Sequence, residues 1–227
     1  MAAGSPFTGG TAISAGTLLV SNTSGSATGG GAVSLLSGAT LGGTGVIAPT
    51  GTNSVSLAGF ISPGGSVSAV TGGSYANSIG TLTFNLGNTT GTINAAGATF
   101  LMQLGSSDTI AITGASAGDL AFSGNVIDLL GTGSAANSPY KLFDTSLDAT
   151  TWTGLAFDGT TGVISAGLSA INAPLAHSAT LLVGTAGNGL NAGDIYVSLT
   201  VPEPTAALAS IATGGLLLRR RNPLLIT

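Results

Sequence analysis

The chain has 227 residues, of which 43% are hydrophobic and only 5% are charged, with a formal net charge of −4 at pH 7. Disordered proteins show the reverse, low hydrophobicity with high charge, so we expect an ordered fold. Nucleic-acid binding requires a face rich in lysine and arginine, but three of the four basic residues are Arg219, Arg220 and Arg221 at the C-terminus. We therefore expect no nucleic-acid partner, and the absence of cysteine excludes disulfides and thiolate metal sites.

The N-terminal segment, residues 1–10, contains no basic residue and no apolar run of the kind that a signal peptide requires. At the other end of the chain, Pro-Glu-Pro is followed by an apolar run and three arginines, an order that indicates a C-terminal export label. We therefore interpret the chain as the C-terminal part of a longer product, or as one whose start is misassigned. A longer upstream reading frame that encodes a signal peptide is the expected observation, and a stop codon just before Met1 would contradict it.

Residues 16–45 alternate short apolar runs with clusters of glycine, serine and asparagine, in the sequence GTLLVSNTSGSATGGGAVSLLSGATLGGTG. With the preceding FTGGTAIS, this stretch resembles the autotransporter-associated β-strand repeat, also called the passenger-associated transport repeat. The resemblance implies a right-handed parallel β-helix of short stacked strands. More loosely, residues 61–66, 78–85 and 98–114 resemble the segment that follows this repeat in large surface proteins.

Alternation with a period of two predicts three half-buried strands, in residues 81–86, 108–113 and 195–201. The side chains expected to face inward are Leu82, Phe84 and Leu86 in the first, Ile110 and Ile112 in the second, and Ile195, Val197, Leu199 and Val201 in the third. Glycine-rich corners separate the strands; they occupy residues 28–31, 42–45, 64–66, 72–74 and 187–189. No segment before Thr205 shows a helical stripe.

These patterns predict an all-β body, a right-handed parallel β-helix or solenoid, followed by a single C-terminal hydrophobic helix. We expect residues 1–60 to form the repeat region, residues 61–200 its continuation and cap, and residues 201–227 a sorting segment. The scarcity of aromatic residues favours a thin core of small aliphatic side chains. About eight to ten rungs stacked about 4.8 Å apart would give a rod about 40 to 50 Å long.

Residues 137–155 contain the only tryptophan and the only lysine of the chain. The segment provides four candidate glycan contacts. The rings of Tyr140 and Trp152 could stack on sugars, and the carboxylates of Asp144 and Asp148 could bind sugar hydroxyls. The alternative, which we favour, is that the two rings pack with Leu142 and Phe143 over the end of the β-helix, because an exposed last rung needs a cap.

The sequence predicts no enzyme activity, no cofactor and no metal site. The only histidine, His177, has no acidic residue near it in the sequence, whereas a catalytic triad needs an oriented base. The only lysine, Lys141, does not belong to a phosphate-binding loop motif. The only close carboxylate pair is Asp144 with Asp148, in a setting, DTSLD, that is typical of a turn. The isolated acidic residues are interpreted as turn formers; they are Asp108, Asp119, Asp128 and Asp158.

The C-terminal segment combines a Pro-Glu-Pro motif, an uncharged apolar run and a basic cluster. Pro202, Glu203 and Pro204 end the preceding strand, since proline lacks an N–H and fixes φ. Residues 205–218 are predicted to form a membrane helix, whose candidate residues are Thr205, Leu208, Ile211, Leu216, Leu217 and Leu218. Arg219, Arg220 and Arg221 would hold its end on the cytoplasmic side. The run is shorter than the about 20 residues that a bilayer requires, and the alternative is a terminal core helix.

This segment resembles the PEP-CTERM sorting signal of exported bacterial proteins. In that family, an exosortase in the inner membrane recognises the tail, removes it near the Pro-Glu-Pro motif and passes the body to the cell surface or the exopolysaccharide matrix. The resemblance implies an exosortase as partner and exopolysaccharide as a further candidate partner. It also implies a transient location in the inner membrane, followed by the surface or matrix of a Gram-negative-type bacterium.

The function expected from these features is that of a non-enzymatic surface or extracellular-matrix protein, a β-helical stalk or adhesin with a role in adhesion and biofilm. The alternative is a polysaccharide-active β-helix enzyme, a lyase or hydrolase, with the same tail. Such an enzyme needs two carboxylates, or a carboxylate and a base, that converge in space. A third interpretation, an autotransporter passenger, would require a C-terminal barrel with a terminal aromatic residue, and the chain ends in RRRNPLLIT instead.

Overall fold

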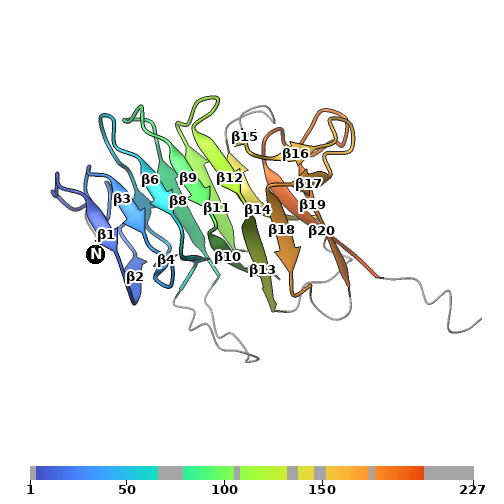
Figure 1. Cartoon of the computed structure of the whole chain (residues 1–227), viewed down its shortest axis with the longest axis horizontal. Coiled ribbons are helices and arrows are strands. Elements are labelled where there is room, and N and C mark those ends of the chain that lie inside the picture. The colour runs from blue at the N-terminus through green and yellow to red at the C-terminus, as the bar shows by residue number, and fades with distance from the viewer. Residues whose placement is uncertain are drawn as a thin grey trace, which may run out of the picture.

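The computed structural model describes residues 4–65, 79–104, 108–131, 138–145, 152–173 and 177–201. Within these ranges the chain forms strands and no helix, which confirms the all-β prediction for the body. The described strands form three six-stranded sheets, called here sheets A, B and C, and one two-stranded sheet. Figure 1 shows the strands following one another along the long axis. The predicted sorting motif, membrane helix and basic cluster, residues 202–221, lie outside the described residues.

Neighbouring strands in each of the three large sheets are hydrogen-bonded to one another in the following order. Sheet A contains β1 (Thr11–Ile13), β3 (Val33–Leu35), β6 (Val55–Leu57), β9 (Ile93–Ala96), β12 (Leu120–Ser123) and β15 (Trp152–Thr153). Sheet B contains β2 (Thr17–Val20), β4 (Thr40–Gly43), β7 (Phe60–Pro63), β10 (Thr99–Leu104), β13 (Asn125–Gly131) and β18 (Leu168–Ile171). Sheet C contains β5 (Val46–Ile47), β8 (Thr81–Asn85), β11 (Thr109–Thr113), β14 (Tyr140–Thr145), β20 (Ile195–Thr200) and β19 (Ser178–Val183). The fourth sheet pairs β16 (Ala156–Phe157) with β17 (Ile164–Ala166).

From β3 to β14, the chain visits sheets A, B and C in rotation, so that each circuit adds one strand to each sheet. All pairings between successive circuits in this part are parallel. In sheet A, Thr11, Val33 and Val55 are register partners, and so are Ile13, Leu35 and Leu57. Parallel pairing in register therefore stacks aliphatic side chains from one circuit on those of the next, which builds a continuous core.

The predicted alternation is confirmed in two of the three strands without exception. Leu82, Phe84 and Leu86 are buried at β8, while Ile110 and Ile112 are buried in β11. In β20, the buried side chains are Ile195, Val197 and Leu199, as predicted, and also Tyr196, which was expected to face outward. Val201 follows the end of β20 and is 64% exposed, so the expectation that it faces inward was wrong. The strand ends at Thr200, two residues before Pro202.

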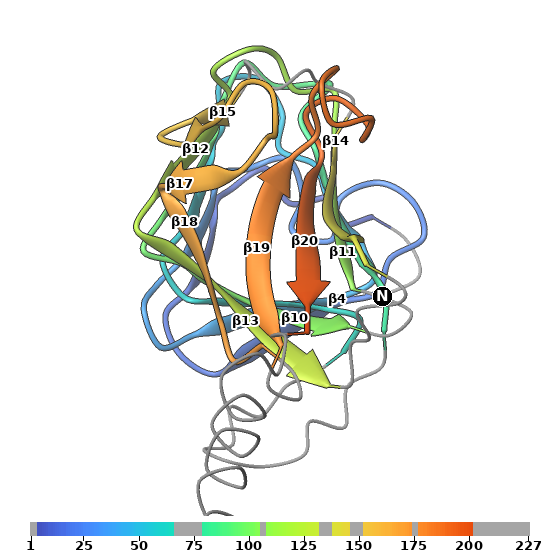
Figure 2. The ribbon, with the colours of Figure 1, turned by 90° about the vertical axis from the view of Figure 1, so that its right-hand side faces the viewer.

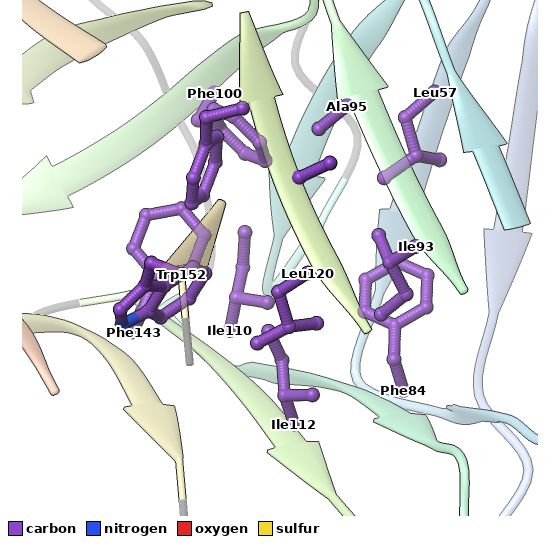
Figure 3. A pocket seen from close by; sticks show the side chains of 12 residues that line it. Leu57, Phe84, Ile93, Ala95, Phe100, Ile110, Ile112, Leu120, Phe143 and Trp152 are labelled. Atoms are coloured by element: carbon purple, nitrogen blue, oxygen red, sulfur yellow. The ribbon is translucent and has the colours of Figure 1, made fainter. Parts of the chain in front are cut away.

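The core is mostly aliphatic, as predicted, but its later circuits also contain an aromatic cluster that the sequence did not predict. Phe100, Phe143 and Trp152 lie close together in the interior (Figure 3), and the ring of Phe122 contacts all three of them. The four rings come from all three large sheets. The ring centroids of Phe122 and Trp152 are 4.9 Å apart, and those of Phe100 and Phe143 are 5.1 Å apart in an edge-to-face arrangement. Such aromatic pairs stabilise a core by about 0.5–1.5 kcal/mol each beyond the burial of their area.

The C-terminal end of the parallel stack is covered by antiparallel strands. β20 pairs with β14 in antiparallel register, and β19 pairs with β20 along its whole length, from Ser178 opposite Thr200 to Val183 opposite Ile195. Figure 2, which looks at this end, shows β19 and β20, the last two strands of sheet C, lying in front of the earlier strands. Their buried side chains join the main core. The sequence predicted that Tyr140, Leu142, Phe143 and Trp152 would pack over this end. In the structure these residues belong to β14 and β15, and the β19–β20 hairpin covers the end instead.

Two corner residues explain how the chain turns between sheets. Gly43 has a φ of +110°, and a Cβ atom at this position would lie 2.0 Å from the carbonyl oxygen of Val20. Asn22 is buried, and its Nδ2 donates to the carbonyl oxygens of Gly25 and Val46, at 3.0 and 3.2 Å, while its Oδ1 accepts from the N–H of Val46. This amide satisfies backbone groups that no sheet ladder reaches.

The body is shorter than the sequence suggested. Among the described residues, each large sheet contains six strands, which at about 4.8 Å per strand span about 25 Å rather than 40 to 50 Å. The expected boundary between residues 60 and 61 falls inside β7, which pairs with β4 on one side and with β10 on the other. The stack of sheets is continuous across this position.

Candidate functional site

Side chains that point outward from sheet A form a polar column. Register partners in successive strands place six residues in line across the sheet: Ala12, Ser34, Ser56, Asn94, Ala121 and Thr153. Four of the six carry a hydroxyl or amide group, and Ser56, Asn94 and Thr153 are exposed. Because neighbouring strands lie about 4.8 Å apart, the column presents neutral hydrogen-bonding groups at regular intervals.

The outer face of sheet C is also rich in hydroxyl and amide groups. Thr81 is the register partner of Thr109, and Asn85 is the partner of Thr113. Thr83, between Thr81 and Asn85 on the same side of β8, is partly exposed. These groups donate and accept hydrogen bonds without carrying charge. Sheets A and C therefore offer two faces suited to a ligand with many hydroxyl groups.

The rings expected as candidate glycan contacts lie inside the protein. Tyr140 and Trp152 are each 5% exposed. Trp152 packs against Phe122 and Phe143, and its Nε1 donates to the carbonyl oxygen of Gly193 at 2.6 Å. In place of a sugar-stacking face, the structure shows two buried rings, because satisfied packing and hydrogen bonding hold them in the core. Their burial, together with that of Leu142 and Phe143, agrees with the favoured packing alternative, but β14 lies between β11 and β20 in sheet C and does not cover the end of the stack.

Of the two candidate carboxylates, only that of Asp144 belongs to the described residues. Asp144 lies on the surface, where its carboxylate contacts the Nζ of Lys141 at 3.2 Å. Asp148 lies outside the described residues. The carboxylate that approaches Lys141 most closely is one that the sequence did not suggest. Oδ2 of Asp194, which lies 53 residues further along the chain, is 2.8 Å from the Lys141 Nζ.

Asp194 is the centre of a buried polar cluster that joins β14 to the cap. It is 1% exposed, accepts hydrogen bonds from the N–H of Thr145 at 2.7 Å and from the hydroxyl of Tyr196 at 3.2 Å, and is paired with Lys141. Burial lowers the pKa of Lys141, but the hydrogen bonds and charges of Asp194 and Asp144 raise it more, so that the pKa lies above its ordinary value. Burial raises the pKa of the Tyr196 hydroxyl, and the negative charge of Asp194 raises it further.

Asp108 is a second buried carboxylate. It is 0% exposed and accepts hydrogen bonds from the N–H of Gly80 at 3.0 Å and of Gln103 at 2.9 Å. Burial raises the pKa of Asp108 to about 6, against the lowering effect of these two hydrogen bonds. The sequence predicted a local turn former, but this carboxylate also connects the residue before β8 to the end of β10.

The other isolated acidic residues behave in two ways. Asp119 accepts from the N–H of Ser116, and Asp158 accepts from the N–H groups of Thr160 and Thr161, so both are turn formers as predicted. The hydrogen bonds of Asp158 to Thr161, followed by that to Thr160, lower its pKa. Asp128 instead accepts from the Nδ2 of Asn172, 2.9 Å away, across the β13–β18 pair.

His177 lies immediately before β19 and is partly exposed. Among the described residues, no group of three histidine, cysteine, aspartate or glutamate side chains is placed to hold a metal ion. In the same part of the chain, no helix has the length and apolar character needed to cross a bilayer. No family model, curated protein or solved structure matches the chain.

Proposed function

We propose that the chain is a non-enzymatic surface or extracellular-matrix protein that is exported from a bacterial cell. Its body is a right-handed parallel β-helix that serves as a short stalk or adhesive segment, and its tail is a PEP-CTERM sorting signal. The observation that most supports the adhesive role is the pair of neutral hydroxyl-rich and amide-rich faces on sheets A and C.

The order of the strands supports the β-helical description of the body. Each circuit from β3 to β14 contributes in turn to sheets A, B and C, and every circuit pairs in parallel with the next. In a solenoid, each unit contacts mainly its neighbours and the outer faces carry regularly repeated side chains. The column from Ser34 through Ser56 to Asn94 has this character.

The chemistry of these faces favours a polysaccharide as the ligand. Sugars present many hydroxyl groups at short intervals, and serine, threonine and asparagine both donate to and accept from such groups. A regular series of weak contacts gains strength from multivalency, since each further contact forms within an already bound chain. A single deep pocket is therefore unnecessary for retention on a polysaccharide matrix.

A retention experiment tests the adhesive role. We expect the Ser56→Ala, Asn94→Ala double variant to be retained several-fold less than the unchanged chain on immobilised dextran, a neutral glucan. The matched control is Ser14→Ala with Ser37→Ala, which removes two exposed hydroxyls at corners outside the column. Equal retention of both variants and the unchanged chain would contradict the role of the column.

The sorting role rests on the resemblance of the tail and is tested in cells. Replacing Pro202, Glu203 and Pro204 with alanine should leave the full-length form in the inner membrane of a host that has an exosortase. Val201→Ala, a change at an exposed position next to the motif, is the control and should be exported normally. Normal processing of the triple variant would refute the sorting proposal.

A polysaccharide lyase or hydrolase remains the second candidate function, and one observation favours it. The Lys141 amine lies within 3.2 Å of two carboxylates, those of Asp144 and Asp194, which is the convergence of groups that such an enzyme needs. Incubation with soluble polysaccharides and measurement of newly formed chain ends tests this alternative. Activity that disappears in Asp144→Asn, a change at the exposed member of the cluster, would favour the enzyme.

A further inference from the structure

The polar column on the outer face of sheet A carries its hydrogen-bonding groups in single file. In β3 and in β6, one outward residue lies between two buried residues, so these strands contribute one serine each, Ser34 and Ser56. In β9, the next position of the column is Asn94. Figure 1 shows β3, β6, β9 and β12 following one another along the long axis. A ligand that contacts successive column residues must therefore run along this axis and across the strands.

The central groups of the column are free to bind a ligand. Among the described residues, the hydroxyls of Ser34 and Ser56 form no hydrogen bond. The Nδ2 of Asn94 has no partner there either, while its Oδ1 accepts from a backbone N–H within β9 at 3.2 Å. By contrast, the hydroxyl of Thr153 donates to the carbonyl oxygen of Leu120 at 2.9 Å. Three neighbouring strands thus present two hydroxyls and one amide nitrogen at intervals of about 4.8 Å.

One charged side chain lies close to this column. Within the described ranges, Asp119 is the only charged residue that belongs to a strand of sheet A or lies within two positions of one. It precedes Ala121, the register partner of Asn94, by two residues. Because side chains alternate along a strand, Asp119 lies on the same side as Ala121, about 7 Å away. Its carboxylate is partly exposed and accepts from the N–H of Ser116 at 2.6 Å.

We propose that the column binds neutral polysaccharides and that the charge of Asp119 disfavours anionic ones, such as polymers that carry uronate groups. The proposal rests on the polysaccharide-binding role proposed above and specifies its ligand. For a carboxylate bound opposite Ala121, about 7 Å from the charge of Asp119, Coulomb's law in water gives a loss of about threefold in affinity. At an ionic strength of about 0.01 M the Debye length is about 30 Å, so salt does not screen this repulsion.

The charges on the rest of the described body do not offset the repulsion. Lys141 is the only lysine or arginine of this part of the chain, and it lies in sheet C, where it is paired with Asp144 and Asp194. Sheet C also places the exposed Asp144 beside Ala111, its register partner. Discrimination of this kind comes from an unfavourable charge against the wrong ligand rather than from further contacts with the right one.

Two matched matrices and two matched variants of the full chain test the proposal. The matrices are dextran and carboxymethyl-dextran of the same chain length, which differ only in their carboxylates. The variants are Asp119→Asn, beside the column, and Asp128→Asn, in β13 of sheet B, and each removes one negative charge. Asparagine still accepts hydrogen bonds through its Oδ1. The basic cluster of the tail is present in every chain compared, so its attraction to carboxylates is the same in all of them.

On carboxymethyl-dextran at about 0.01 M salt, we expect Asp119→Asn to be retained about threefold more than the unchanged chain. At about 1 M salt, where the Debye length is about 3 Å, the two should be retained equally. Asp128→Asn should match the unchanged chain, and dextran should retain all three equally. No gain for Asp119→Asn, or an equal gain for Asp128→Asn, would overturn the role of the Asp119 charge. Absence of any retention of the unchanged chain on dextran would instead refute the polysaccharide-binding role itself.

Discussion

The ion pair between Lys141 and Asp194 should contribute far more to stability than the ion pair between the same lysine and Asp144. Asp194 is almost fully buried, whereas the side chain of Asp144 is 53% exposed. Asp144→Asn and Asp194→Asn are isosteric changes that each remove one carboxylate charge beside the same amine. The comparison isolates the effect of burial.

The expected magnitudes follow from the two environments. Exposed ion pairs contribute about 0–1 kcal/mol, so Asp144→Asn should lower the free energy of unfolding by less than about 1 kcal/mol. Breaking a buried pair costs about 3–5 kcal/mol. Because the Lys141 side chain is 29% exposed and partly solvated, we reduce this figure to about 2–3 kcal/mol for Asp194→Asn.

Removal of the lysine tests the same point from the other side. Lys141→Met leaves the buried Asp194 carboxylate with the N–H of Thr145 and the hydroxyl of Tyr196 but without its cation. The Lys141→Met, Asp194→Asn double variant should be destabilised by less than the sum of the two single changes, because it leaves no orphaned buried charge.

Urea unfolding followed by the fluorescence of Trp152 measures these differences, since this buried ring is the only tryptophan.

Because the pKa of Lys141 is raised in the folded chain, the stabilising contribution of this lysine is complete below the ordinary pKa of lysine and is lost as the pH rises through the raised value. Equal destabilisation by Asp144→Asn and Asp194→Asn would refute the assignment of Asp194 as the principal partner.

Three further predictions concern the corners, the buried acid and the aromatic core. Gly43→Ala should destabilise the body by more than 3 kcal/mol, because its Cβ would collide with backbone, whereas Gly16→Ala, also at positive φ but with open space, should cost about 1 kcal/mol by chemical denaturation. The pKa of Asp108 is raised from 3.8 to about 6, so between these pH values the folded state binds more protons than the unfolded state. The free energy of unfolding should therefore fall as the pH rises from about 4 to about 6, and Asp108→Asn should reduce this pH dependence. Trp152→Ala should cost about 3–5 kcal/mol by thermal denaturation, and a cost below 1 kcal/mol would contradict its placement in the core.

Local patterns in the sequence predicted the strands well where alternation was regular. Leu82, Phe84, Ile110 and Ile112 are buried as expected, because period-two alternation directly reports which face of a strand meets the core. The same rule failed for Tyr196, since its hydroxyl finds Asp194 inside the protein. A hydrogen bond to the residue that directly precedes the strand thus overrode the alternation.

Features that depend on contacts between distant residues could not be predicted. The column of Ser34, Ser56 and Asn94 follows from register between circuits of unequal length, which alternation within one strand does not determine. The pairing of Lys141 with Asp194 depends on the reversal of strand direction at the cap. The charged and aromatic residues in residues 137–155 did signal an unusual region, and the favoured alternative predicted that Tyr140 and Trp152 pack against neighbouring side chains. It did not predict that β14 lies inside sheet C, because this depends on its pairing with β20.

The intact mass of the protein recovered from the cell surface tests the central proposal most directly. We expect a mature form whose mass corresponds to a chain ending close to Pro202, Glu203 and Pro204, without the basic cluster. A surface form that retains Arg219, Arg220 and Arg221, or a full-length chain found only in the cytoplasm, would contradict sorting by the tail.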